Sequence, residues 1–191
     1  MRTGERFAST KESTNLTEDF NVLRARKAFA DLEGWVLSEE ALTLPEHKVE
    51  REIDQRGREV WRCMLQANIC RRGAGNAGRS IEVTHEDGQV HQQKERRNDK
   101  RKVVSIFGDV QVERTAYTAP GQKTVHPLDE EMQLPERSFS YEMQRRIVDE
   151  AVRGPFDEAI ESIEKNTGNH VFKRSTEQIT IDAAQDFDTF Y

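Results

Sequence analysis

The chain changes character abruptly at a glycine-rich segment near its middle. Residues 73–78 have the sequence Gly-Ala-Gly-Asn-Ala-Gly, and so many glycines are unfavourable inside a helix or a strand. Before this segment the apolar residues recur every three or four positions, whereas after it they alternate with polar ones. The segment therefore predicts a flexible connector, residues 72–79, between a helical region and a β region.

Two helices are predicted in the region before the connector, residues 17–71. Thr17 can cap a helix that ends or bends at Gly34, and Pro45 favours the start of a longer helix that runs to about Arg71. The longer helix carries one apolar stripe, typical of a packing or dimer interface, formed by Val49, Ile53, Val60, Trp61, Met64, Leu65 and Ile69. Residues 1–16 have few large apolar side chains, which predicts a disordered arm.

The region after the connector, residues 80–137, predicts a small antiparallel meander. Ile81 to Val83 alternates in polarity, and Asp87-Gly88 is a strong hairpin signal. Two further turns are predicted at Gly108-Asp109 and at Pro120-Gly121.

The last region, residues 138–191, predicts three helices. Ser140 caps the first, and the second spans residues 156–166 and ends at Gly168. Ser175 is expected to cap the third, with Gln178 as its capping-box partner. The last two helices and the turn at Gly168 have the outline of a helix-turn-helix. The predicted fold class is α+β, with N-terminal helices, a small antiparallel sheet and C-terminal helices.

Composition limits the classes of function. The net charge of −6 over 191 residues excludes a uniformly basic nucleic-acid binder, but binding depends on where positive charge is concentrated. No segment approaches the roughly 20 apolar residues that span a bilayer, and the first residues lack the apolar core of a signal peptide. Cys63 and Cys70 lie two turns apart on one predicted helix, too far to bridge. We expect a cytoplasmic protein with reduced thiols and no membrane partner.

No catalytic, cofactor or metal site is predicted. The acidic residues 129–131 are adjacent, so their side chains do not converge. The five histidines are scattered, and neither a nucleophile elbow nor a Walker loop occurs. The glycine-rich segment matches G-x-G-x-x-G, but it follows a helix and precedes a strand, the reverse of a dinucleotide-binding turn. We therefore expect a protein that is not an enzyme.

Two segments could contact DNA. Residues 94–102 contain six basic and two acidic residues, which could neutralise several phosphates or merely form a solvated turn. The start of the last predicted helix could approach base edges, or that helix could belong to an ordinary helical hairpin. The candidate DNA-binding residues are Lys94, Arg96, Arg97, Lys100, Arg101, Lys102, Lys173, Arg174, Ser175 and Gln178.

Five ordered motifs between about Arg72 and Ala183 resemble the N-terminal half of ISKra-type insertion-sequence transposases. They are Gly73-x-Gly75-x-x-Gly78, the segment from Val103 to Tyr117, Gly121-Gln-Lys123, Pro127-Leu128-Asp129-Glu130, and Leu134-Pro135 followed by Phe139-Ser140-Tyr141. The resemblance implies recognition of the ends of a mobile element, with a ribonuclease-H-like catalytic domain beginning near the end of this chain. No residue here corresponds to the catalytic triad. Related families carry a cysteine-containing zinc ribbon after the tyrosine, but residues 117–123 contain no cysteine.

Together these features predict a DNA-binding N-terminal fragment of a transposase that recognises double-stranded DNA at element ends. Such a fragment could be one product of a split coding region, a degenerate remnant or a domesticated binder. The rival hypothesis is a protein interaction module with no DNA binding of its own. In that case the long amphipathic helix would form a homodimer or dock on a separate catalytic transposase subunit.

Overall fold

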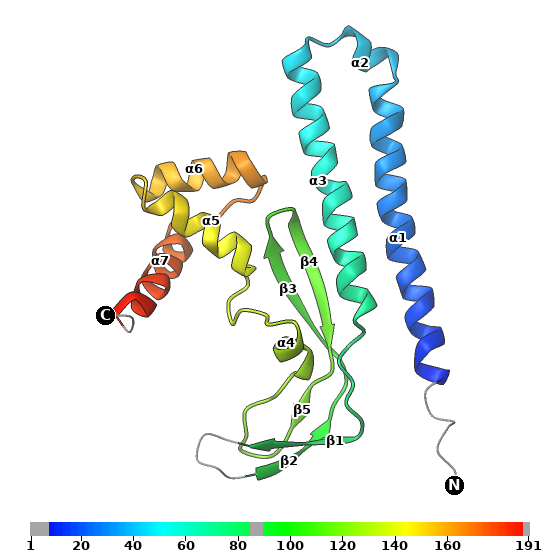
Figure 1. Ribbon diagram of the computed structural model, residues 1–191, viewed down its shortest axis with the longest axis vertical. Helices are drawn as coiled ribbons and strands as arrows, with labels where there is room; N and C mark the ends of the chain where they lie inside the picture. Colours follow the sequence, from blue (N-terminus) through cyan, green and yellow to red (C-terminus); the bar gives the residue numbers. More distant parts are fainter. Residues whose placement is uncertain (1–7, 85–89, 189–191) are drawn as a thin grey trace.

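The computed structural model describes residues 8–84 and 90–188 and shows the predicted α+β class (Figure 1). Helices form both ends of the described chain, and the strands lie between them. The elements in chain order are α1 (Ala8–Val36), α2 (Glu39–Thr43), α3 (Glu46–Arg71), β1 (Ser80–Thr84), β2 (Val90–Glu95), β3 (Asp99–Ser105), β4 (Gly108–Arg114), β5 (Tyr117–Thr118), α4 (Pro127–Glu131), α5 (Tyr141–Ala151), α6 (Phe156–Thr167) and α7 (Lys173–Asp188).

Helices α1 and α3 form a long antiparallel hairpin with α2 at its tip (Figure 1). The predicted long helix is confirmed as α3, with Pro45 at its N-cap. The first helix begins at Ala8 instead of Thr17, so residues 8–16 are helical and not a disordered arm; residues 1–7 lie outside the described residues. Extending a formed helix is far easier than nucleating one. Gly34 lies inside α1 and does not end it.

The apolar stripe predicted on α3 does not form a single interface. Val60 is buried on the side of α1, whereas Ile69 packs against the β3–β4 hairpin. Trp61 and Met64 are exposed. The prediction was wrong because the stripe is wider than one interface, and α3 has neighbours on two of its sides.

The two cysteines of α3 are free thiols, as predicted. Cys63 is buried and Cys70 is half-buried. Burial raises the pKa of the Cys63 thiol, so this group stays protonated at neutral pH.

Strands β3 and β4 form a hairpin whose loop is Ile106-Phe107, two residues earlier than the predicted turn at Gly108-Asp109. Ser105 pairs with Gly108, and the Ser105 hydroxyl donates to the Gly108 carbonyl and accepts from the Phe107 amide. Gly108 has φ of 119°, a conformation that favours glycine. The glycine therefore starts β4 immediately after the loop and does not form the loop itself.

The remaining strands form a separate sheet with the order β1-β2-β5. The single predicted meander is therefore divided in two, because β5 pairs with β2 and not with β4. The predicted Asp87-Gly88 turn lies outside the described residues. The turn at Pro120-Gly121 is confirmed by a hydrogen bond from the Gln122 amide to the Ala119 carbonyl, with Gly121 at φ of 75°.

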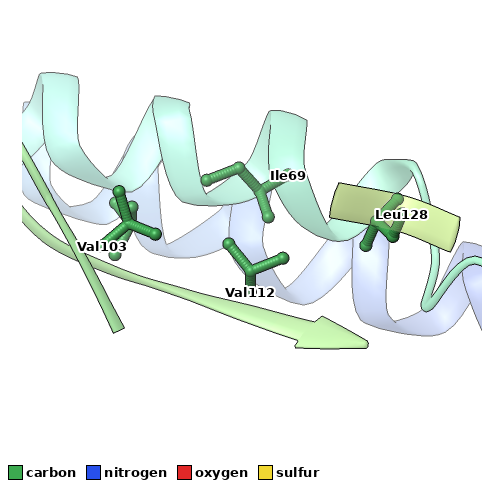
Figure 2. Close-up of a cluster of buried hydrophobic side chains, with 5 residues drawn as sticks. Ile69, Val103, Val112 and Leu128 are labelled. Carbon is green, nitrogen blue, oxygen red and sulfur yellow. The ribbon is translucent and has the colours of Figure 1, made fainter. Parts of the chain in front are cut away.

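One core joins α3, the β3–β4 hairpin and α4. Its buried members are Ile69, Val103, Val110, Val112 and Leu128. Figure 2 shows Ile69 from α3 and Leu128 from α4 beside the hairpin valines. Helix α4 was not expected from the sequence, and it brings Leu128 into this core.

Helices α5, α6 and α7 enclose the second core. Met143 and Ile147 from α5 meet Ile163 from α6 and Ile179 from α7. Ser140 caps α5, as predicted, by accepting from the Met143 amide. The Ile106 side chain from the β3–β4 loop also packs against this core.

The predicted end of α6 is confirmed, whereas the predicted start of α7 is wrong. Gly168 ends α6 in the left-handed conformation, with φ of 71°, as expected. Helix α7 begins at Lys173, so Ser175 lies in its first turn and does not cap it. The Ser175 amide donates to the Phe172 carbonyl, and Gln178 donates to Asp182, so the predicted capping box is absent.

The glycine-rich connector is packed against its surroundings. The Ala74 carbonyl accepts from the Thr115 amide at 2.7 Å, and the Tyr117 hydroxyl accepts from the Ala77 amide at 2.8 Å. A Cβ at Gly75 would lie 2.7 Å from the Leu128 Cβ. The segment is therefore a turn held by hydrogen bonds and packing. Position 75 requires glycine because α4 approaches it closely.

Replacing Gly75 by alanine should destabilise the protein more than replacing Gly73. Both glycines have positive φ, so each alanine costs about 1–2 kcal/mol in the backbone. Only Gly75 would also overlap Leu128, because no atom lies within 4 Å of a Cβ at Gly73. Gly75→Ala should therefore lower the free energy of unfolding, measured with urea, by roughly 1–3 kcal/mol more than Gly73→Ala does. Equal losses would show that the Leu128 contact does not constrain this position.

Candidate nucleic-acid interface

The basic segment, residues 94–102, spans three pieces of local structure. Residues 94 and 95 end β2, residues 96–98 link the two sheets, and residues 99–102 form the first half of β3. Side chains alternate across a strand, so Lys100 and Lys102 project from one face of β3 and Arg101 from the other. The segment therefore divides its positive charge between two faces.

Arg101 projects into the protein. Its side chain is 16% exposed and contacts Asp129, with 3.5 Å between Nη1 and Oδ2. Its Nη2 donates to the Pro135 carbonyl and, at 2.7 Å, to the Arg137 carbonyl. These partners use the donors that a phosphate would need, so the structure gives Arg101 a role in holding the loop before α5.

A second arginine, Arg114 of β4, completes this internal network. Its side chain is 9% exposed and binds Asp129 and Asp99, the latter at 2.6 Å. The Arg114 guanidinium lowers the pKa of Asp99, so that carboxyl stays ionised at neutral pH. Asp99 therefore balances charge inside the protein although it lies within the basic segment.

Four cations of the basic segment are exposed and have no ion-pair partner among the described carboxylates. These are Lys94, Arg96, Arg97 and Lys100. Lys102 is also exposed but pairs with Asp109, with 2.5 Å between Nζ and Oδ2. Two nearby acids accept hydrogen bonds from neutral amides: Glu95 from Asn76 and Glu113 from Asn98.

A hollow of about 560 Å³ lies beside three of these cations, Arg96, Arg97 and Lys100. Thr118, Thr124 and His126 are among its other lining residues. Burial and the nearby Arg114 lower the pKa of His126, so the imidazole is neutral at pH 7. The charge around this hollow therefore comes from the two arginines and the lysine, with Asp99 as the lining carboxylate.

A larger groove of about 990 Å³ lies between the α1–α3 hairpin and the polar face of β3–β4. Asn98 and Lys100 line both hollows, so the two adjoin at these residues. The groove adds Arg24 from α1 and Arg72 from the end of α3 to the basic surface. Sequence reasoning missed both residues, because they lie far from the basic segment along the chain and reach the groove only through tertiary packing.

The candidate residues of α7 lie on a different element from the basic segment. Lys173 pairs with Asp157 at 2.9 Å, and Gln178 donates to Asp182 at 2.9 Å. Ser175 is half-buried, whereas Arg174 is exposed and has no described carboxylate partner. Neither hollow includes a residue of α7. The structure therefore keeps the two predicted groups apart.

Removing the charge of Asp129 should destabilise the protein strongly. Asp129→Asn leaves the partly buried Arg101 and Arg114 with one carboxylate fewer. We expect the free energy of unfolding, measured with urea at neutral pH, to fall by about 2–4 kcal/mol. The matched control is Asp109→Asn, which breaks the exposed pair with Lys102 and should cost less than about 1 kcal/mol. Similar losses in both variants would contradict a structural role for the Asp129 network.

Further observations bear on what the surface could bind. Among residues 8–84 and 90–188, no group of three histidine, cysteine, aspartate or glutamate side chains is arranged to hold a metal ion. None of the described helices has the length and apolar content needed to cross a bilayer. Comparison with protein-family models, with curated proteins and with solved structures finds no match to this chain. The basic surface is therefore the main guide to function.

Proposed function

We propose that this protein binds double-stranded DNA through the basic surface formed by Lys94, Arg96, Arg97, Lys100, Arg24 and Arg72. The observation that carries the proposal is the exposure of the four cations of residues 94–100 without described carboxylate partners. A cation that already lies in an ion pair must break that pair to bind phosphate. Unpaired cations can release the counterions of DNA directly.

The layout of the charges favours a polyanion over a single small anion. The cations come from β2, the link to β3, β3 itself and the far wall of the groove, so they follow an extended path. A duplex presents one charge for about every 1.7 Å of its axis and can contact such a path at several points. Because the whole chain carries a charge of −6, attraction must come from this surface, and binding should weaken steeply with salt.

Sequence preference is assigned to the start of α7, where Arg174 is exposed and Gln178 is on the surface. Arginine and glutamine are side chains that can form paired hydrogen bonds with base edges. The resemblance to ISKra-type transposases supports element-end DNA as the target. In this proposal the basic surface positions the duplex and α7 contributes selectivity.

Replacing Arg96, Arg97 and Lys100 together by alanine should weaken binding to all duplexes. We expect a ten- to hundredfold loss of affinity at about 0.1 M salt, and the slope of log affinity against log salt should fall by about 2–3. Fluorescence anisotropy titrations at several salt concentrations measure both quantities. The matched control is the triple variant of Lys27, Lys48 and Arg51, which removes the same charge from exposed positions on the α1–α3 hairpin. An unchanged slope in the first variant, or equal losses in both, would contradict the proposal.

Replacing Arg174 and Gln178 by alanine should mainly reduce sequence preference. The ratio of affinities for element-end DNA and an unrelated duplex is expected to fall roughly 5- to 150-fold, which corresponds to about 1–3 kcal/mol of binding free energy. The salt slope should change by about one at most, since a single cation is removed. Competition gel shifts with the two duplexes give the ratio. A parallel loss for both duplexes would show that α7 contributes charge but no selectivity.

A further inference from the structure

The hollow beside Arg96, Arg97 and Lys100 is lined by more positive than negative charge. Its three cations have no described carboxylate partner. Asp99 is its lining carboxylate, and this group is already bound by the Arg114 guanidinium at 2.6 Å. The three cations are therefore available to a negatively charged ligand.

The size and the hydroxyl groups of the hollow suit a single phosphate group. Thr118 of β5 and Thr124 line it, and neither hydroxyl forms a hydrogen bond to another described residue. Phosphate oxygens accept hydrogen bonds from hydroxyl groups and from charged donors. A volume of about 560 Å³ is typical of a small-molecule site, so it can receive one phosphate of a DNA strand but not the body of a duplex.

His126 connects this hollow to the internal network of Arg114 and Asp129. The residue lines the hollow, and its Nε2 is buried without a hydrogen-bond partner, 3.4 Å from the Oδ2 of Asp99. The same oxygen accepts from Arg114, which also pairs with Asp129, and Asp129 is shared with Arg101. The two arginines and two carboxylates balance in charge. A proton on His126 therefore adds a positive charge that this network does not offset.

The charges around His126 decide when it takes up a proton. Burial and Arg114 lower the pKa of His126, whereas Asp129 and Asp99 oppose that change. In the described chain, the surrounding charged groups come from the link between the sheets, β3, β4 and α4, and they are Arg96, Arg97, Asp99, Lys100, Arg114 and Asp129. A phosphate in the hollow adds negative charge beside the cations, which favours the imidazolium form.

We propose that this hollow binds one phosphate group of the DNA backbone and that His126 takes up a proton from solvent when the phosphate binds. The proposal rests on the proposed DNA-binding function and adds to it a phosphate subsite whose occupancy depends on pH. The charge of the imidazolium is offset by the phosphate and by Asp99. Binding and protonation are linked, so each strengthens the other by the same factor. Affinity for a duplex should therefore increase as the pH falls.

Proton NMR of the histidine rings tests this linkage in the unchanged chain, with the His126 signal identified by its absence from the His126→Gln variant. A unit charge about 6 Å away moves a titration midpoint by roughly 0.5–2 pH units, for effective dielectric constants of about 80 to 20. Saturating duplex DNA should raise the His126 midpoint by this amount. The control is His47, exposed near the tip of the α1–α3 hairpin (Figure 1), whose midpoint should change less.

The outcomes of the NMR experiment separate this inference from the proposed function. A duplex that binds, as measured by fluorescence anisotropy, without moving the His126 midpoint would overturn the linkage and leave the DNA-binding proposal intact. If no duplex binds, the proposed function fails, and the present inference fails with it.

The pH dependence of affinity gives a second test. Between about pH 8 and about pH 5.5, at constant salt, the duplex dissociation constant should fall several-fold more for the unchanged chain than for His126→Gln. Glutamine is polar but does not titrate. The matched control is His47→Gln, which should retain the pH dependence of the unchanged chain. An equal pH dependence in all three proteins would contradict proton uptake by His126.

Replacing both threonines of the hollow by valine tests the phosphate subsite. Thr118→Val with Thr124→Val keeps the side-chain shape but removes two hydroxyl donors, and it should weaken duplex binding roughly tenfold at neutral pH. The rise of the His126 midpoint on DNA binding should become smaller as well. The matched control is Thr84→Val, at an exposed position of β1 that does not line the hollow. A double variant that binds as tightly as the unchanged chain would rule out the subsite.

Discussion

The β3–β4 hairpin connects the two helical parts of the molecule, because its two edges are bound by different segments of the chain. A two-stranded hairpin is at best marginally stable in water. Here the Gln66 side chain binds both backbone groups of Gln111 at the β4 edge, and the backbone of Ser138 and Ser140 binds Val104 at the β3 edge. The apolar face is covered by α3 and α4, and the hairpin loop reaches the core of α5–α7. The position of the basic surface therefore depends on these edge contacts.

The pleat of β3 places its basic side chains on two faces, one directed into the protein and one exposed. Arg101 projects inward and, with Arg114, shares Asp129, whereas its neighbour Lys100 projects into the groove. An arginine removed from water needs a carboxylate or several carbonyl groups to offset its lost hydration. Internal arginines therefore require acidic partners, which contribute to the negative total charge without covering the exposed cations.

Features set by neighbouring residues were predicted well. The long helix α3, the Ser140 cap and the glycine that ends α6 each depend on short spacings or on one side chain. Features set by distant pairing were missed. The division into two sheets depends on β5 joining β2, and α4 gains its place from Leu128 in a core shared with α3 and the β3–β4 hairpin. The start of α7 was misplaced because a good capping residue was available two positions inside the helix.

The candidate site likewise combines properties set by neighbouring residues with properties set by distant contacts. The order of residues along the chain was enough to locate the concentration of lysine and arginine at 94–102 and the amphipathic character of α3, because both properties are local. Folding assigned Arg101 to the interior, added Arg24 and Arg72 to the groove, and left one side of α3 without a described neighbour. These outcomes depend on which segments pack together, since a side chain's exposure is set by neighbours that can be far away in sequence.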